Sequence, residues 1–225
     1  MAEFALVHGA WHGAWCWERT IAELGARGHR AIAMDLPSDR LDATLDDYAA
    51  AVIDAMHVLG DAPIVVGHSF GGFTIPVVAD RRAVSRLVFL AAFVPQLGRT
   101  PGETMADDRC TARGFRSELL DDGRTLPAPE TASHFMTHDV RDGDAFHTRL
   151  RPQAWTATEL PYPLAHWPAV ASSYIVCSGD RLLLPECQRR LARDRLGVEP
   201  VELPGGHEPM LARAGELAAV LAALA

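Results

Sequence analysis

Residues 64–73 read IVVGHSFGGF, and this stretch decides the class of fold. The β-branched apolar run is typical of a buried strand, and a helical pattern follows over 73–79. Ser69 stands at the junction, where the backbone must bend sharply. Glycines two residues to either side, Gly67 and Gly71, remove side chains that would clash in such a turn. The stretch therefore predicts a strand, a tight turn and a helix that lift the Ser69 hydroxyl clear of a sheet; an inert serine in a glycine-rich turn is the alternative.

Five other short runs share this continuous apolar character. Strands that are apolar throughout, without alternation, are expected where helices cover both faces of a sheet. The expected strands cover 4–8, 31–35, 64–68, 87–92, 173–178 and 200–203.

Helical patterns lie between most of these strands. The clearest spans 44–59, where apolar residues recur every three or four positions, Thr44 suits the N-cap and Gly60 follows as a stop. Two more are expected over about 185–196 and 210–224. The alternation predicts an α/β protein with a doubly wound, mostly parallel six-stranded sheet.

The alternation breaks between 95 and 168, which is rich in Asp, Arg, Thr, Pro and Gly. Periodicity there is weak and confined to about 115–120 and 144–150. Because such a length is unusual for a structureless loop, we expect a helical cap insertion over the carboxyl edge of the sheet. The whole chain is then a single domain, with 1–94 and 169–225 forming its core.

Composition excludes several classes of function. The 225-residue chain carries a net charge of −8, whereas a nucleic-acid partner requires a basic face. All 21 basic residues are arginine, so Schiff-base, pyridoxal-phosphate and P-loop chemistry, which need lysine, are absent. The arginine-rich, lysine-free bias indicates a high-GC bacterial source.

The sequence gives no reason to expect a membrane-spanning segment or a secretory leader. No apolar run approaches the roughly 18 residues of a membrane span, and no basic leader with a cleavage site precedes the first strand. The cysteines Cys16, Cys110, Cys177 and Cys187 form no CxxC pair, which favours reduced thiols in a cytoplasmic protein. We expect no membrane partner, and leave self-association as a homodimer open.

A nucleophilic serine needs a base, and the base needs an orienting acid. In strand–turn–helix sites of this kind the chain order is serine, acid, histidine. Asp180 follows the strand at 173–178, and His207 lies between the last strand and the last helix. Ser69, Asp180 and His207 are therefore the predicted catalytic residues.

The oxyanion of an acyl-transfer intermediate needs backbone N–H donors. The Phe70 N–H follows the serine at a helix start, and the loop after the first strand offers the Ala10 N–H. Metal ligation by His8 with His12, or by His134 with His138, is the alternative use of these histidines; the loop context and the missing third ligand argue against it. We expect no metal and no cofactor.

Candidate substrate-binding residues flank these positions in the sequence. They are Gly9, Trp11, Phe93, Trp155, Glu208 and Met210. For Trp11, Phe93, Trp155 and Met210, ordinary core packing is the competing interpretation.

With these motifs in place, the chain resembles the α/β-hydrolase superfamily along nearly its whole length. More narrowly, it is similar to the branch of plant methylesterases, hydroxynitrile lyases and small bacterial esterases. The resemblance is carried by LVHGAWHGAWCW at 6–17, GHSFGG at 67–72, Asp180 with LPE at 184–186, and GHEPML at 206–211. The insertion matches poorly, apart from LRPQ at 150–153.

Two departures from that branch bear on the reaction. One type of lyase in the branch carries a lysine after its catalytic histidine, to hold cyanide, and a threonine in the oxyanion loop; here these positions are Glu208 and Gly9. Esterases of the branch usually have an apolar residue in place of Glu208. This carboxylate could repel acidic substrates, raise the pKa of His207 or face solvent.

The resemblance and the residues together imply a serine hydrolase that cleaves a small or medium carboxylic ester through an acyl-enzyme intermediate. One alternative is a lyase, decarboxylase or cyclase that uses the same site on a carbonyl substrate. Another is a binding protein that retains the pocket for a small ligand but turns over slowly.

Overall fold

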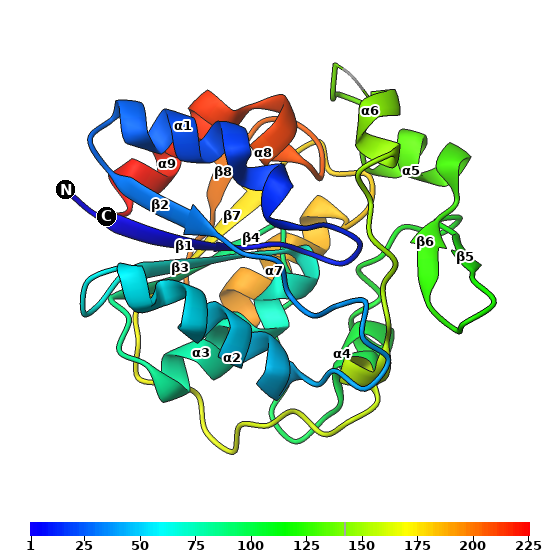
Figure 1. Ribbon diagram of the computed structural model, residues 1–225, viewed down its shortest axis with the longest axis horizontal. Helices are drawn as coiled ribbons and strands as arrows, with labels where there is room; N and C mark the ends of the chain where they lie inside the picture. The colour runs from blue at the N-terminus through cyan, green and yellow to red at the C-terminus, as the bar shows by residue number, and fades with distance from the viewer. Residues whose placement is uncertain (142) are drawn as a thin grey trace.

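The computed structural model describes residues 1–141 and 143–225. A six-stranded sheet runs through its centre in the order β2-β1-β3-β4-β7-β8, with every neighbouring pair parallel (Figure 1). The strands are β1 (Glu3–Val7), β2 (Arg30–Ala33), β3 (Ile64–His68), β4 (Arg86–Leu90), β7 (Ser172–Cys177) and β8 (Val201–Leu203). The doubly wound sheet expected from the sequence is confirmed, and no strand end differs from expectation by more than two residues.

Helices cover both faces of the sheet (Figure 1). Helices α1 (Glu18–Ala26) and α9 (Ala214–Ala223) bury their apolar residues in one core cluster. Helices α2 (Leu45–Ala55), α3 (Ile75–Arg81) and α7 (Pro185–Leu196) contribute to the cluster on the other face. This arrangement explains why the central strands are apolar throughout.

Helix α2 begins as its sequence predicts. The Thr44 hydroxyl accepts from the Asp47 N–H and the Asp47 carboxylate accepts from the Thr44 N–H, which completes a capping box. The α-helix ends at Ala55 and a 3₁₀ turn, η2 (Met56–Val58), follows before Gly60. The expected helix at 210–224 is broken at Arg213 into α8 (Pro209–Ala212) and α9.

The insertion lies beside the carboxyl ends of the strands (Figure 1). It contains helices α4 (Pro101–Asp108), α5 (Pro129–Phe135) and α6 (Gly143–His147). It also contains an antiparallel hairpin of β5 (Ser117–Leu119) and β6 (Thr125–Pro127), so the helical reading of 115–120 was wrong. The β5 residues are all exposed, and a strand of three exposed residues leaves no hydrophobic alternation in the sequence. Position 142 of the expected insertion lies outside the described residues.

A disulfide bond and an ion pair are among the contacts that join the C-terminal end of helix α4, in the insertion, to helix α7 of the core. Cys110 and Cys187 form a disulfide bond, with their Cα atoms 5.4 Å apart. The expectation of reduced thiols was wrong for this pair, because the fold brings together cysteines 77 positions apart in the chain. Arg195 Nη1 also lies 2.8 Å from Asp108 Oδ2, in an ion pair largely shielded from solvent.

Cys16 and Cys177 are buried free thiols. Across 1–141 and 143–225, no helix combines the length and the apolar character that crossing a membrane requires.

Candidate active site

Ser69 occupies the sharp turn between β3 and the following helices. Its φ of +51° is in the left-handed region, which a serine adopts only where the surroundings hold it there. Packing around the turn is tight: a Cβ on Gly67 would lie 2.8 Å from the Gly71 carbonyl oxygen, and one on Gly72 would lie 2.1 Å from that of Phe93. The turn therefore requires glycine at both positions, and it leaves Ser69 partly exposed at the carboxyl edge.

His207 and Asp180 come from neighbouring loops at the same edge. The Gly179 N–H donates to the Gly205 carbonyl, which joins the loop after β7 to the loop after β8. His207 Nδ1 then lies 2.7 Å from Asp180 Oδ2, with both side chains buried. A carboxylate can only accept, so Nδ1 carries the proton and Nε2 is left as the basic nitrogen. Burial lowers the pKa of His207, but the charges of Asp180 and Glu208 and the bond to Asp180 outweigh it, so the pKa is raised overall.

The Asp180 carboxylate is itself held by several donors. Its Oδ1 accepts from the N–H groups of Leu182 and Leu183 at 2.8 and 3.0 Å. Its Oδ2 accepts from Gln188 Nε2 at 2.8 Å as well as from His207. Sequence reasoning missed Gln188, because its role depends on α7 turning that side chain back toward the end of β7.

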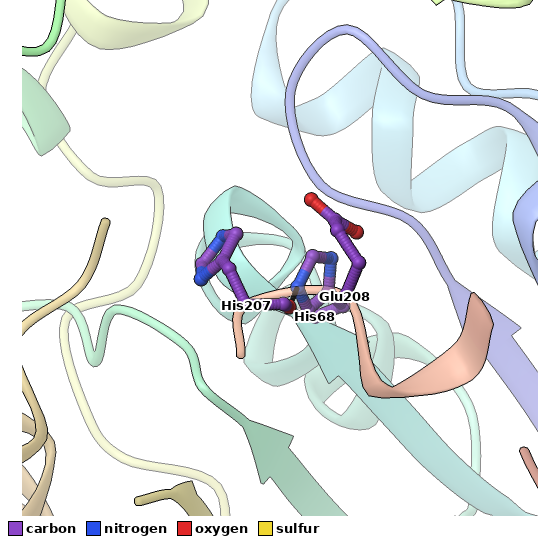
Figure 2. Close-up of side chains that lie close together, drawn as sticks. All are labelled: His68, His207 and Glu208. Atoms are coloured by element: carbon purple, nitrogen blue, oxygen red, sulfur yellow. Dashed lines mark hydrogen bonds between the residues drawn. The ribbon is translucent and has the colours of Figure 1, made fainter. Parts of the chain in front are cut away.

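His68 holds the backbone of His207. Its Nε2 donates to the His207 carbonyl at 2.8 Å, and the two rings lie beside each other with centroids 4.7 Å apart (Figure 2). Burial lowers the pKa of His68 to about 3, so it is neutral near pH 7. His68, the last residue of β3 and the residue before Ser69, thus helps to hold the His207 backbone in place.

Two backbone N–H groups beside Ser69 are suited to an oxyanion. Phe70 is the second residue of η3 (Ser69–Phe73), where an N–H has no acceptor within the helix. Among the described residues, the Ala10 N–H also has no hydrogen-bond acceptor. His8 supports the Ala10 loop: its Nδ1 donates to the Gly9 carbonyl at 2.7 Å and its Nε2 accepts from the Leu36 N–H at 3.0 Å.

The insertion reaches the same loop through its last residues. The Arg151 N–H donates to the Trp11 carbonyl at 2.8 Å, and the Trp11 N–H donates weakly to Gln153 Oε1 at 3.4 Å. Gln153 Nε2 donates onward to the Tyr48 hydroxyl at 3.0 Å. These bonds join LRPQ at 150–153, in the insertion, to the loop that carries Ala10 and to α2.

Ser69 and His207 open onto one cavity of about 210 Å³. Most of its wall is apolar and aromatic, and Trp11, Phe93 and Trp155 lie on it. The full lining is Ala10, Trp11, Ser69, Phe70, Phe93, Met105, Thr111, Phe115, Ser117, Trp155, Leu182, Leu183 and His207. Between Ser69 and His207 themselves, the described residues show no hydrogen bond, as is common in a site without substrate.

Three of the expected pocket residues do not line this cavity. Met210 is fully buried in the core cluster around α9, and Gly9 packs against Ser69, where a Cβ would lie 2.8 Å from that of the serine. Glu208 is also fully buried and faces His12 on the far side of His207. The sequence missed Met105, Phe115, Leu182 and Leu183, whose apolar character does not distinguish a cavity wall from a core.

A group of potential metal ligands lies behind the cavity. Among the described residues, His68, His207 and Glu208 place ligand atoms within 4.8 Å of one another. His68 Nε2 and His207 Nδ1 are taken by hydrogen bonds, so a metal would have to use His68 Nδ1 and His207 Nε2 and would compete with His12 for the Glu208 carboxylate. This group does not include the histidine pairs that the sequence offered as metal ligands, which are His8 with His12 and His134 with His138.

A family model described as "Alpha/beta hydrolase family" matches residues 4–220. The chain belongs to the alpha/beta hydrolase family. This hydrolase is 34% identical to a protein named "Carbendazim hydrolyzing esterase" from Nocardioides sp. (strain SG-4G), over 100% of both chains. It is 28% identical to "Methylesterase 7" of Arabidopsis thaliana, over 99% of this chain and 96% of the relative.

Solved structures share the fold of this alpha/beta hydrolase at lower identity. Polyneuridine aldehyde esterase superposes with a TM-score of 0.83 at 21% identity, covering 100% of this chain and 99% of that one. A pyrethroid hydrolase from Sphingobium faniae JZ-2 superposes with a TM-score of 0.79 at 21% identity, over 99% and 96% of the two chains.

Proposed function

We propose that this alpha/beta hydrolase cleaves a small or medium carboxylic ester, with Ser69 as nucleophile, His207 as base and Asp180 as its orienting acid. The observation that carries the proposal is the hydrogen bond from His207 Nδ1 to Asp180 Oδ2, 2.7 Å long, behind a cavity that both Ser69 and His207 line. Ester hydrolysis is further supported by relatives named carbendazim hydrolyzing esterase and methylesterase.

The chemistry follows from the protonation state of His207. Its Nε2 takes the Ser69 proton while the serine oxygen attacks the ester carbonyl, and the resulting imidazolium is stabilised by Asp180. The N–H groups of Ala10 and Phe70 are the donors for the oxyanion, each worth about 3 kcal/mol in comparable sites. His207 then gives the proton to the departing alcohol, which leaves an acyl-enzyme. In the second half of the reaction His207 takes a proton from water, the water attacks the acyl-enzyme, and His207 returns the proton to the Ser69 oxygen as the acid is released.

The cavity wall supports an apolar, uncharged substrate. Aromatic rings surround the serine, and the Trp11 ring lies edge-on to Trp155, with centroids 5.4 Å apart. No lysine, arginine, aspartate or glutamate is among the described lining residues, so a charged acyl group would lose its hydration without gaining a counter-ion. Neutral aryl or short alkyl esters are therefore the expected substrate class.

The test is an ester panel that varies the acyl chain and the alcohol group, run on wild type and Ser69→Ala together. Wild type should prefer neutral compact esters, Ser69→Ala should lose turnover, and a fluorophosphonate probe should label Ser69. Unchanged turnover in Ser69→Ala would exclude the serine mechanism. Product formation from a carbonyl substrate with little ester hydrolysis would favour a lyase, decarboxylase or cyclase, and tight binding with almost no turnover would favour a binding protein.

A further inference from the structure

Glu208 is the residue directly after His207, and its side chain turns away from the cavity. Figure 2 shows its carboxylate pointing to the other side of the loop from the His207 ring. Glu208 is 0% exposed, and its Oε2 lies 3.2 Å from His12 Nε2, which is 1% exposed. In the part of the chain that the structure describes, neither carboxylate oxygen accepts a regular hydrogen bond, so this ion pair is what compensates the buried charge.

His12 connects this ion pair to the oxyanion loop. Its Nδ1 lies 2.7 Å from the Ala10 carbonyl oxygen. A carbonyl accepts but does not donate, so Nδ1 carries a proton. Nε2 faces the Glu208 carboxylate, and two lone pairs at 3.2 Å would repel, so a proton must lie between these two groups. His12 therefore contacts the oxyanion loop through Nδ1 and Glu208 through Nε2.

We propose that Glu208 is a positioning residue whose buried ion pair with His12 ties the loop carrying His207 to the loop carrying the Ala10 oxyanion donor. The inference rests on the proposed function, since it assigns those two loops their roles. The ion pair explains why a carboxylate is tolerated at position 208, which does not contact the cavity. Glu208 binds His12, and His12 binds the Ala10 carbonyl, so the two loops of the site are connected.

The pair also has an electrostatic consequence for His207. The titratable groups facing Glu208 are His12, His68 and His207, with the thiols of Cys16 and Cys177 also within its field. Burial raises the pKa of Glu208, but His12 outweighs it and lowers that pKa to about 2, so the group is a carboxylate at neutral pH. Burial, the largest effect, lowers the pKa of His207, and Asp180 raises it. The negative charge of Glu208 adds a smaller rise in the same direction as Asp180. Removing the Glu208 charge should therefore lower the pKa of His207.

Two kinetic readouts test the link. The first is the rate at which a fluorophosphonate labels Ser69, and the second is the pH profile of kcat/KM on a p-nitrophenyl ester, with active enzyme counted by the same probe. Glu208→Gln keeps the shape and removes the charge. We expect kcat and the labelling rate to fall about ten- to a hundredfold, KM to stay within about twofold, and the acid limb of kcat/KM to move to lower pH. Glu199→Gln, which removes an exposed carboxylate that pairs with Arg193, is the matched control and should behave as wild type.

A double-mutant cycle separates positioning from general destabilisation. If the two residues act as one link, Glu208→Gln with His12→Gln should cost little more than either change alone, whereas independent effects would multiply. Multiplying effects, or a Glu208→Gln enzyme with wild-type kcat and acid limb, would overturn the proposal. If wild type is neither labelled nor active, the proposed function fails instead. The nitrogen-15 chemical shifts of His12 then test the ion pair independently of activity. The ion pair requires both ring nitrogens to be protonated, so a ring with only one protonated nitrogen contradicts it.

Discussion

Gln188 Nε2 lies 2.8 Å from Asp180 Oδ2, so a side chain on α7 shares the carboxylate oxygen that His207 uses. Gln188 is fully buried, and its Oε1 accepts from the Cys177 N–H at 3.0 Å, which fixes the direction of the amide. The amide thus holds the same Asp180 oxygen that accepts from His207.

We predict that Gln188→Leu lowers kcat/KM about tenfold and the free energy of unfolding by about 1–3 kcal/mol, because it removes a donor to a buried carboxylate. The measurements are ester turnover and urea denaturation. Arg193→Gln, on the exposed side of the same helix, is the control and should change stability by no more than about 0.5 kcal/mol. A Gln188→Leu enzyme with wild-type turnover would mean that the Leu182 and Leu183 N–H groups hold Asp180 without it.

The pH dependence of catalysis should report the raised pKa of His207. His207 acts as a base only when neutral, so the acid limb of kcat/KM should lie above the ordinary histidine pKa of about 6.5. Asp180→Asn removes the charge that favours the imidazolium, so the limb should move to lower pH while kcat falls about 10³- to 10⁴-fold. Rate profiles between pH 5 and 9, normalised by active-site labelling, measure both effects. A limb that stays in place would show that Asp180 does not act on His207.

The ion pair between Arg195 and Asp108 should matter for stability rather than for chemistry. Arg195→Met leaves the buried Asp108 carboxylate without its partner, which costs about 3–5 kcal/mol and lowers Tm by roughly 6–20 °C. Adding Asp108→Leu should recover much of the loss, since an apolar pair of similar volume avoids the unpaired charge. Calorimetry on the three variants gives the comparison, and a double variant less stable than Arg195→Met would contradict this account.

The disulfide between Cys110 and Cys187 should stabilise the junction of the insertion with α7. It closes a loop of 77 positions, and loss of such a cross-link costs about 2–4 kcal/mol. Dithiothreitol should therefore lower the Tm of wild type but leave that of Cys110→Ser with Cys187→Ser unchanged. Thermal unfolding with and without reductant is the measurement, and a wild-type Tm insensitive to reductant would show that the two thiols are reduced in solution.

Much of the fold was accessible from local patterns in the chain. Strand β3 and helix α7 have the bounds that the sequence predicted, because a continuous apolar run and a capped, periodic helix depend mainly on neighbouring residues. The hairpin of β5 and β6 was missed, because each strand is only three residues long and β5, which is fully exposed, carries no apolar alternation. The pairing of Cys110 with Cys187 was missed as well, because it depends on where two distant helices meet.

In the candidate site too, local sequence predicted some features and contacts between distant residues decided the others. By itself the sequence predicted the sharp turn at Ser69, since glycines two residues to either side leave room for a tight backbone there, and it predicted Asp180 and His207 from their order after successive strands. Only the tertiary structure decided what surrounds them. It turned Gln188 onto Asp180 and aimed Glu208 at His12 instead of the cavity. Such contacts join residues far apart in the chain, and their direction is set by how helices and loops pack, which no local pattern records.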